Sequence, residues 1–67
     1  MIHILVNGER RQIPQQQTVR ELVVLLGFKD KPVAVEVNRQ LVPRRQHEQH
    51  HLSEGDVVEV VTFVGGG

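Results

Sequence analysis

The chain has 67 residues and no cysteine, and its eight Lys and Arg residues balance its eight Asp and Glu residues. This length suits one small domain with a thin hydrophobic core and argues against a deep, fully walled substrate pocket. The missing cysteines exclude disulfides, thiolate metal sites and cysteine nucleophiles, and the balanced charge gives no reason to expect a nucleic acid or an anionic membrane surface as partner.

Targeting and membrane-spanning segments are not expected. The opening Met-Ile-His-Ile-Leu-Val lacks the basic n-region and small-residue cleavage site of a signal peptide, and no apolar run approaches the roughly 20 residues of a membrane span. Trp and Tyr are missing, which removes the stacking platforms of single-strand nucleic-acid binders. We therefore expect one domain over residues 1–67, located in the cytoplasm.

The first two strands are predicted to form a β-hairpin. Residues 2–6 are a short β-branched run, and Asn7-Gly8 follows them. Both turn residues tolerate positive φ, which a type I′ hairpin turn requires. The return strand passes through residues 11–13 and is ended by Pro14.

The clearest helix begins at Thr18. Thr18 and Glu21 have the spacing of a capping box, in which each residue's side chain accepts from the other's backbone N–H. An apolar stripe with helical spacing follows and is expected to be the main apolar contribution to the core from outside the sheet. The stripe consists of Val19, Leu22, Val23 and Leu26. Gly27 lies where a left-handed C-cap would end the helix.

Further strands are predicted after the helix, over residues 33–37, 40–42 and 57–64, with Asn38-Arg39 as a tight turn. The resulting order, β-β-α-β-β-β, indicates an α+β fold with a mixed sheet and one helix packed on one face. The other face of the sheet must then meet water or a partner.

Alternation along the last strand assigns its side chains to the two faces of the sheet. The set expected under the helix is Val58, Val60 and Thr62, and the opposite set is Val57, Glu59, Val61 and Phe63. Exposed apolar side chains at Val61 and Phe63, just before the end of the chain, suggest a docking surface.

The chain ends in Gly65-Gly66-Gly67, which carries no side chains. Such a tail is flexible and can enter a channel too narrow for a Cβ. The terminal carboxyl has a reference pKa of about 3.5, so it is an anion at neutral pH and a competent nucleophile toward the α-phosphate of ATP. The alternative interpretation is an inert, frayed end. A phosphate cradle is disfavoured, because no helix or lysine follows these glycines.

Three histidines, His47, His50 and His51, lie in a polar stretch that is expected to be a loop or a turn or two of helix. Their spacing could bring imidazoles together for zinc, but no thiolate or suitably placed carboxylate completes a tetrahedral set. We favour a solvated polar segment without a metal site.

Three arginines flank Pro43 and could form a local basic spot: Arg39, Arg44 and Arg45. A solvated edge is the simpler interpretation, and an acidic partner surface is the alternative.

Segments along the whole chain carry a resemblance to a known family. They are Ile2 to Gly8, Thr18 to Leu22, Ala34 to Asn38, Val42-Pro43-Arg44, Leu52 with Gly55-Asp56, and Gly66-Gly67. Together they resemble the ThiS family of thiamine-biosynthesis sulfur carriers, within the ubiquitin-like β-grasp superfamily. The Asn38 and Val42-Pro43-Arg44 element, with the short length, favours ThiS over the longer molybdopterin carriers.

The resemblance implies a carrier protein, not an enzyme, with no bound cofactor or metal. A ThiF-like adenylyltransferase would use ATP and Mg²⁺ to convert the Gly67 carboxylate into an acyl adenylate. Sulfur relayed from a cysteine desulfurase would give a Gly67 thiocarboxylate, which a ThiG-like thiazole synthase would use for the thiazole of thiamine. Gly65 and Gly66 would form the tail beside Gly67. The docking candidates are Val61, Phe63 and Val64.

Other functions remain open at this point. A carrier of the same kind could feed molybdopterin, cysteine or natural-product biosynthesis. A ubiquitin-like binding domain with an inert tail and a histidine-dependent metal module are the other two classes. The free protein is expected to be a monomer.

Overall fold

The computed structural model describes residues 1–63 of the chain. Its elements, in order, are β1 (Ile2–Val6), β2 (Glu9–Ile13), α1 (Val19–Leu25), β3 (Val33–Val37), β4 (Gln40–Val42), the 3₁₀ helix η1 (Arg44–Gln46) and β5 (Val57–Thr62). This order confirms the predicted β-β-α-β-β-β arrangement. β5 ends at Thr62, so Phe63 lies beyond the strand, and the predicted strand end at Val64 falls outside the described residues.

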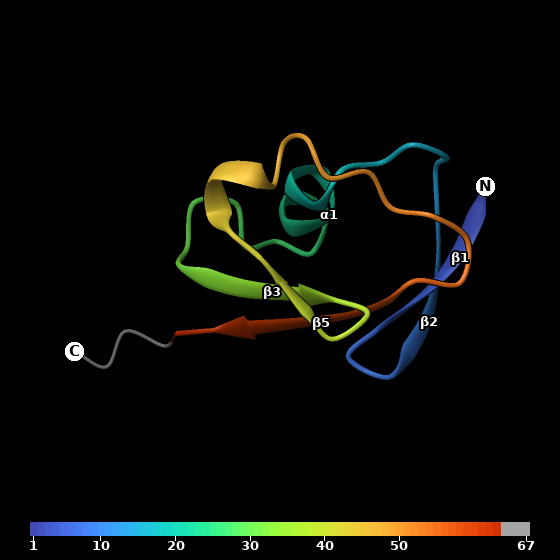
Figure 1. Ribbon diagram of the computed structural model, residues 1–67. Helices are drawn as coiled ribbons and strands as arrows, with labels where there is room; N and C mark the ends of the chain where they lie inside the picture. Colours follow the sequence, from blue (N-terminus) through green and yellow to red (C-terminus); the bar gives the residue numbers. More distant parts are fainter. Residues whose placement is uncertain (64–67) are drawn as a thin grey trace.

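The strands form a mixed sheet in the order β2-β1-β5-β3-β4. β1 and β5 run parallel, and the β1–β2, β3–β4 and β3–β5 pairs are antiparallel. Helix α1 and the segment that carries η1 lie on the same side of this sheet (Figure 1). The described residues therefore have the β-grasp type of α+β fold, with one face of the sheet covered by the helix.

Both tight turns between antiparallel strands use residues with positive φ. In the β1–β2 turn, φ is 51° at Asn7 and 84° at Gly8, and in the β3–β4 turn it is 53° at Asn38 and 70° at Arg39. Asn tolerates this left-handed region better than most residues, and Gly adopts it without a steric penalty. The two turns therefore occur where the sequence predicted them.

Helix α1 is capped at both ends by residues that the sequence analysis identified. Thr18 Oγ1 accepts from the Glu21 N–H at 3.1 Å, and Glu21 Oε1 accepts from the Thr18 N–H at 2.9 Å, which completes the predicted capping box. At the other end, φ of Gly27 is 91°, and the Gly27 and Phe28 N–H groups donate to carbonyls of the last turn, as in a Schellman motif. These caps position the helix over the sheet.

The core lies between the sheet and α1, and it is entirely aliphatic apart from His47. From the helix, Val19, Leu22 and Val23 are buried, whereas Leu26 is only partly buried at the margin. The sheet contributes alternate residues of β1, β3 and β5 and the last residue of β2 and of β4. The buried sheet residues are Ile2, Ile4, Val6, Ile13, Val35, Val37, Val42, Val58 and Val60. The predicted parity of the last strand is confirmed.

The interpretation of the histidine stretch as solvated is wrong for His47. This side chain is 5% exposed, and its Nε2 lies 3.0 Å from the Val42 carbonyl oxygen. The segment also supplies hydrogen-bond acceptors for the first N–H groups of α1. The His47 carbonyl accepts from the Arg20 N–H, and the His50 carbonyl accepts from the Val19 N–H. The first N–H groups of a helix have no partner within it, so this polar segment is packed as a helix cap.

Candidate functional site

The end of β5 is anchored to β3 up to the last described residue. Thr62 pairs with Val33, and the Phe63 N–H donates to the Pro32 carbonyl at 3.2 Å. At the other end of the strand, the side chain of Asn38 accepts from the Val57 N–H at 3.0 Å. The sheet therefore fixes the position of the backbone up to Phe63, the last described residue.

Asn7, in the β1–β2 turn, fixes the middle of β5. Its side-chain oxygen accepts from the Val60 N–H at 2.8 Å, and its side-chain nitrogen donates to the Val60 carbonyl at 3.1 Å. Asn7 thus has a second role that the hairpin pattern did not reveal. It supplies the two bonds that a parallel strand neighbour would make there.

The two described docking candidates are exposed, and Val61 lies on the uncovered face of the sheet. Val61 is 56% exposed and Phe63 is 59% exposed. Leu41 in β4, 63% exposed, belongs to the same face, because it pairs with Glu36, which in turn pairs with Glu59 of β5.

This face combines apolar and acidic side chains. Glu36 and Glu59 are directly opposite one another across the β3–β5 pair, an arrangement that costs stability in isolation. Leu41 is an exposed apolar residue that the sequence analysis did not single out, although the alternation of β4 would have assigned it to this face. A partner covering the face must bury the apolar side chains and satisfy two carboxylates.

The remaining predicted site residues, Val64, Gly65, Gly66 and Gly67, lie outside the described residues. In the sequence, these four residues directly follow Phe63, the last described residue.

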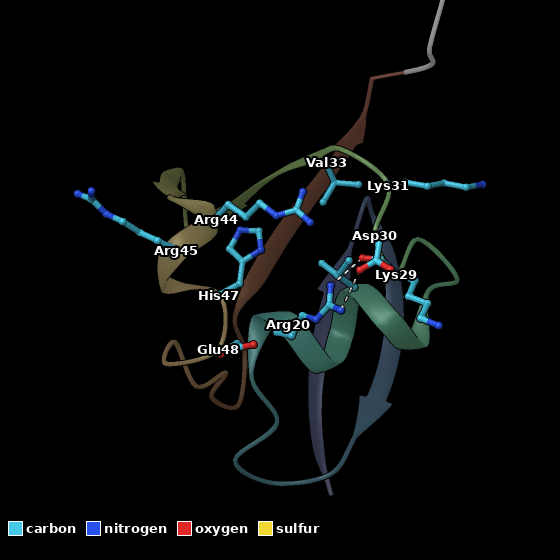
Figure 2. Close-up of a pocket in the computed structure, with 10 residues that line it drawn as sticks. Arg20, Lys29, Asp30, Lys31, Val33, Arg44, Arg45, His47 and Glu48 are labelled. Carbon is cyan, nitrogen blue, oxygen red and sulfur yellow. Dashed lines mark hydrogen bonds and ion pairs between the residues drawn. The ribbon is translucent and has the colours of Figure 1, made fainter.

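A second feature lies on the other side of the molecule, between α1, the loop that follows it and η1. It is an open cavity of about 400 Å³, whose apolar lining residues are Val23 and Val33 (Figure 2). Its cationic lining residues are Arg20, Lys29, Lys31, Arg44 and Arg45. The structure therefore brings Arg44 and Arg45 together with cations from elsewhere, while Arg39, in the β3–β4 turn, does not line the cavity.

Among residues 1–63, no three or more His, Cys, Asp or Glu side chains are grouped so that they could hold a metal ion. In the same part of the chain, no helix is long and apolar enough to cross a membrane.

Comparison with known proteins identifies relatives along the whole chain. The model of the ThiS family matches residues 4–67. The sulfur carrier protein ThiS of Escherichia coli is 35% identical over 66 residues, which are 98% of this chain and the full length of that protein. The crystal structure of the thiamine biosynthesis protein ThiS from Geobacter metallireducens superposes with a TM-score of 0.81 at 29% identity, over 98% of this chain and 100% of that one.

Some relatives are much longer proteins. A thiazole synthase of Paramagnetospirillum magneticum is 39% identical over 64 residues, 96% of this chain, but the chain spans only 20% of that protein's length. A thiazole synthase of Magnetococcus marinus is 41% identical over 66 residues, with the chain again spanning 20% of it.

Proposed function

The chain belongs to the ThiS family, and from that premise we propose that it is a sulfur carrier in which the α-carboxylate of Gly67 is converted to a thiocarboxylate. The sulfur would go to the thiazole moiety of thiamine. The observation that carries the proposal is the family match, which includes the glycine tail together with the fold that presents it. In this role the protein is a co-substrate of its partner enzymes, and it would act in the cytoplasm.

Activation of the carboxylate is the first step of the proposed cycle. A carboxylate resists attack by a nucleophile because its oxygen is a poor leaving group. Attack of a Gly67 carboxylate oxygen on the α-phosphate of ATP releases pyrophosphate and forms an acyl adenylate. A ThiF-like adenylyltransferase would supply the ATP and Mg²⁺ site, and the carrier would contribute only the carboxylate and the surfaces that position it.

Sulfur enters by displacement of AMP. The outer sulfur of a persulfide, supplied through a cysteine desulfurase, forms a bond to the Gly67 carbonyl carbon as AMP leaves. Reduction of the remaining sulfur–sulfur bond by a thiol then releases the thiocarboxylate. A thiazole synthase would take the sulfur from it. The relatives with that name that contain a segment similar to this chain support this choice of acceptor.

The exposed face beside the tail supports docking to such partners. Val61, on the uncovered face of the sheet, and Phe63, directly after β5, are exposed apolar side chains that precede the tail in the sequence. A partner that buries these side chains would fix the start of the tail, so that the few residues after Phe63 can extend into a narrow active-site channel.

Pyrophosphate exchange with the adenylating enzyme tests the proposal. Adding one alanine after Gly67 displaces the reactive carboxylate and places a Cβ in the channel, so exchange should be abolished while the fold is retained. A matched control carries the additional alanine before Met1, which is 68% exposed and far from the tail in sequence. Normal exchange by the C-terminally extended protein would show that the Gly67 carboxylate is not the reacting group.

A further inference from the structure

The charged residues of this chain are distributed unevenly. The cavity beside α1 is lined by five of the chain's eight Lys and Arg residues but by only two of its eight Asp and Glu residues, Asp30 and Glu48. The chain as a whole has no net charge. The cavity is therefore the centre of a positive surface on an otherwise acidic molecule, a feature that the overall composition conceals.

One of the cations has a structural role. The Arg20 guanidinium donates to the Lys29 carbonyl at 2.7 Å and to the Asp30 carboxylate at 3.3 Å (Figure 2). These bonds hold the loop after α1 against the helix, and they also neutralise Asp30.

The other four cations form what we call the basic patch: Lys29, Lys31, Arg44 and Arg45. Within residues 1–63, no carboxylate lies within salt-bridge distance of any of them. Arg44 and Arg45 belong to η1, whose position is set by the buried His47, whereas Lys29 and Lys31 belong to the loop that Arg20 holds. The backbones that carry the patch are thus fixed from both sides of the cavity.

The directions of the side chains indicate the kind of ligand. Arg44 reaches over the cavity toward Val33, whereas Arg45 and Lys31 point away from one another on opposite sides of it (Figure 2). Charges that diverge in this way do not converge on one small anion. They suit several carboxylates spread along a segment of a protein. The lining contains no Phe, Tyr or Trp on which a nucleotide base could stack, and its one histidine, His47, is buried.

The position of the patch connects it with the end of β5. Val33 lines the cavity and pairs with Thr62, and Pro32, next to Lys31, accepts the N–H of Phe63. The basic patch and the exposed Phe63 therefore both lie next to the end of β5. An enzyme that receives the tail comes within reach of both.

We propose that the basic patch docks an acidic segment of the adenylating enzyme and steers the carrier toward it. This inference rests on the proposed function and adds a recognition surface on the helix side of the domain. Complementary charges raise association rates by roughly 10- to 1,000-fold at low ionic strength, and the effect is screened beyond about 8–10 Å at physiological salt. Because the proposed chemistry takes only the Gly67 carboxylate from the carrier, the patch contributes to binding and not to the chemical step.

The test is a kinetic comparison of two doubly charge-reversed carriers in pyrophosphate exchange. Lys31→Glu with Arg44→Glu alters the patch, and Arg10→Glu with Arg11→Glu, on the distant edge strand β2, changes the net charge equally. All four side chains are exposed, so both variants should fold, which circular dichroism and urea unfolding verify. At low salt the patch variant should raise KM for the carrier by about 10-fold or more with kcat unchanged, since uniform binding is lost. The control should change KM less than 3-fold, and added salt should reduce the difference between them.

Equal changes in KM for the two variants would mean that only the net charge of the carrier matters, and this would overturn the proposal. A fall in kcat at unchanged KM would also overturn it, as would binding of anionic vesicles or duplex DNA that depends on the same two residues. Exchange by the wild-type carrier is the separate check on the proposed function. If it is absent, the carrier assignment itself fails, and the partner named for the patch is lost with it.

Discussion

Phe63→Asp should separate docking from stability. Phe63 is 59% exposed, so less than half of its surface is buried in the free protein. Full burial of a phenylalanine contributes about 1.5–3 kcal/mol, and the buried part therefore limits the loss of unfolding free energy to about 1 kcal/mol. At an interface the same ring is a candidate anchor, and truncating such anchors typically costs about 2 kcal/mol or more.

The expected effect on the reaction follows from that figure. A loss of about 2 kcal/mol corresponds to a roughly 30-fold rise in KM for the carrier in pyrophosphate exchange, since about 1.4 kcal/mol is tenfold. The new carboxylate adds a desolvation cost on a face that already has Glu36 and Glu59. A suitable control is Val24→Asp on the exposed side of α1, 45% exposed in the free protein, which should leave KM nearly unchanged.

Two assays, run on the same preparations, decide the matter. Urea unfolding gives the stability change, and pyrophosphate exchange gives KM. If Phe63→Asp unfolds the protein or lowers its stability by several kcal/mol, the ring belongs to the core and the assignment of the two faces is wrong. If stability and KM both remain at the wild-type values, Phe63 is a surface residue without a docking role.

Other substitutions test the core, the histidine segment and the tail. Leu22→Ala should lower the free energy of unfolding by about 2–5 kcal/mol, because the side chain is fully buried, and urea or thermal unfolding would measure a loss that a chain of this size can barely sustain. His47→Ala should lower the free energy of unfolding by about 1–3 kcal/mol, because it leaves the Val42 carbonyl buried without its partner. His51→Ala, at an exposed position, should change it by less than about 0.5 kcal/mol. A similar loss in both variants would contradict the role of His47 in the helix cap. Zinc titration followed by calorimetry should show no submicromolar site, and such a site lost on His50→Ala would restore the metal-module interpretation. Deleting Gly66 and Gly67 should change stability by less than about 0.5 kcal/mol in urea unfolding while abolishing adenylation, and a larger loss would mean that the glycines serve the fold.

Local structure was readable from the sequence where a few neighbouring residues determine it. Asn7-Gly8 specified a turn through the conformations that these two residues tolerate, and Thr18 with Glu21 specified the start of α1 through bonds that close within one helical turn. The two faces of β5 were predictable for a similar reason, because the alternation of side chains along a strand needs no knowledge of its neighbours.

Long-range arrangement was not available from such patterns. The pairing of β5 with β1 and the bonds of Asn7 to Val60 join residues more than fifty positions apart, and the pairing of β5 with β3 joins residues 21 to 29 positions apart. His47 was misread because polarity alone suggests exposure. A histidine can be buried at low cost when its ring nitrogen meets a carbonyl such as that of Val42.

The basic patch shows what local sequence patterns reveal and what depends on long-range packing. Arg44 and Arg45 were recognised as a local basic spot, but they were grouped with Arg39, which the β3–β4 turn places elsewhere. Their companions Lys29 and Lys31 come from the loop after α1, and only the packing of η1 against the helix brings the two segments to one cavity.

Intact-mass measurement tests the central claim most directly. The chain is co-expressed with a ThiF-like adenylyltransferase and a cysteine desulfurase, and purified without exposure to thiol-reactive reagents. A fraction of the protein should be heavier by the mass difference between one sulfur and one oxygen atom, and fragmentation should place that difference at Gly67. The variant with an alanine after Gly67 should show only the unmodified mass. A wild-type protein that remains entirely unmodified alongside both enzymes, or a mass increase located elsewhere in the chain, would contradict the assignment of Gly67 as the sulfur-carrying group.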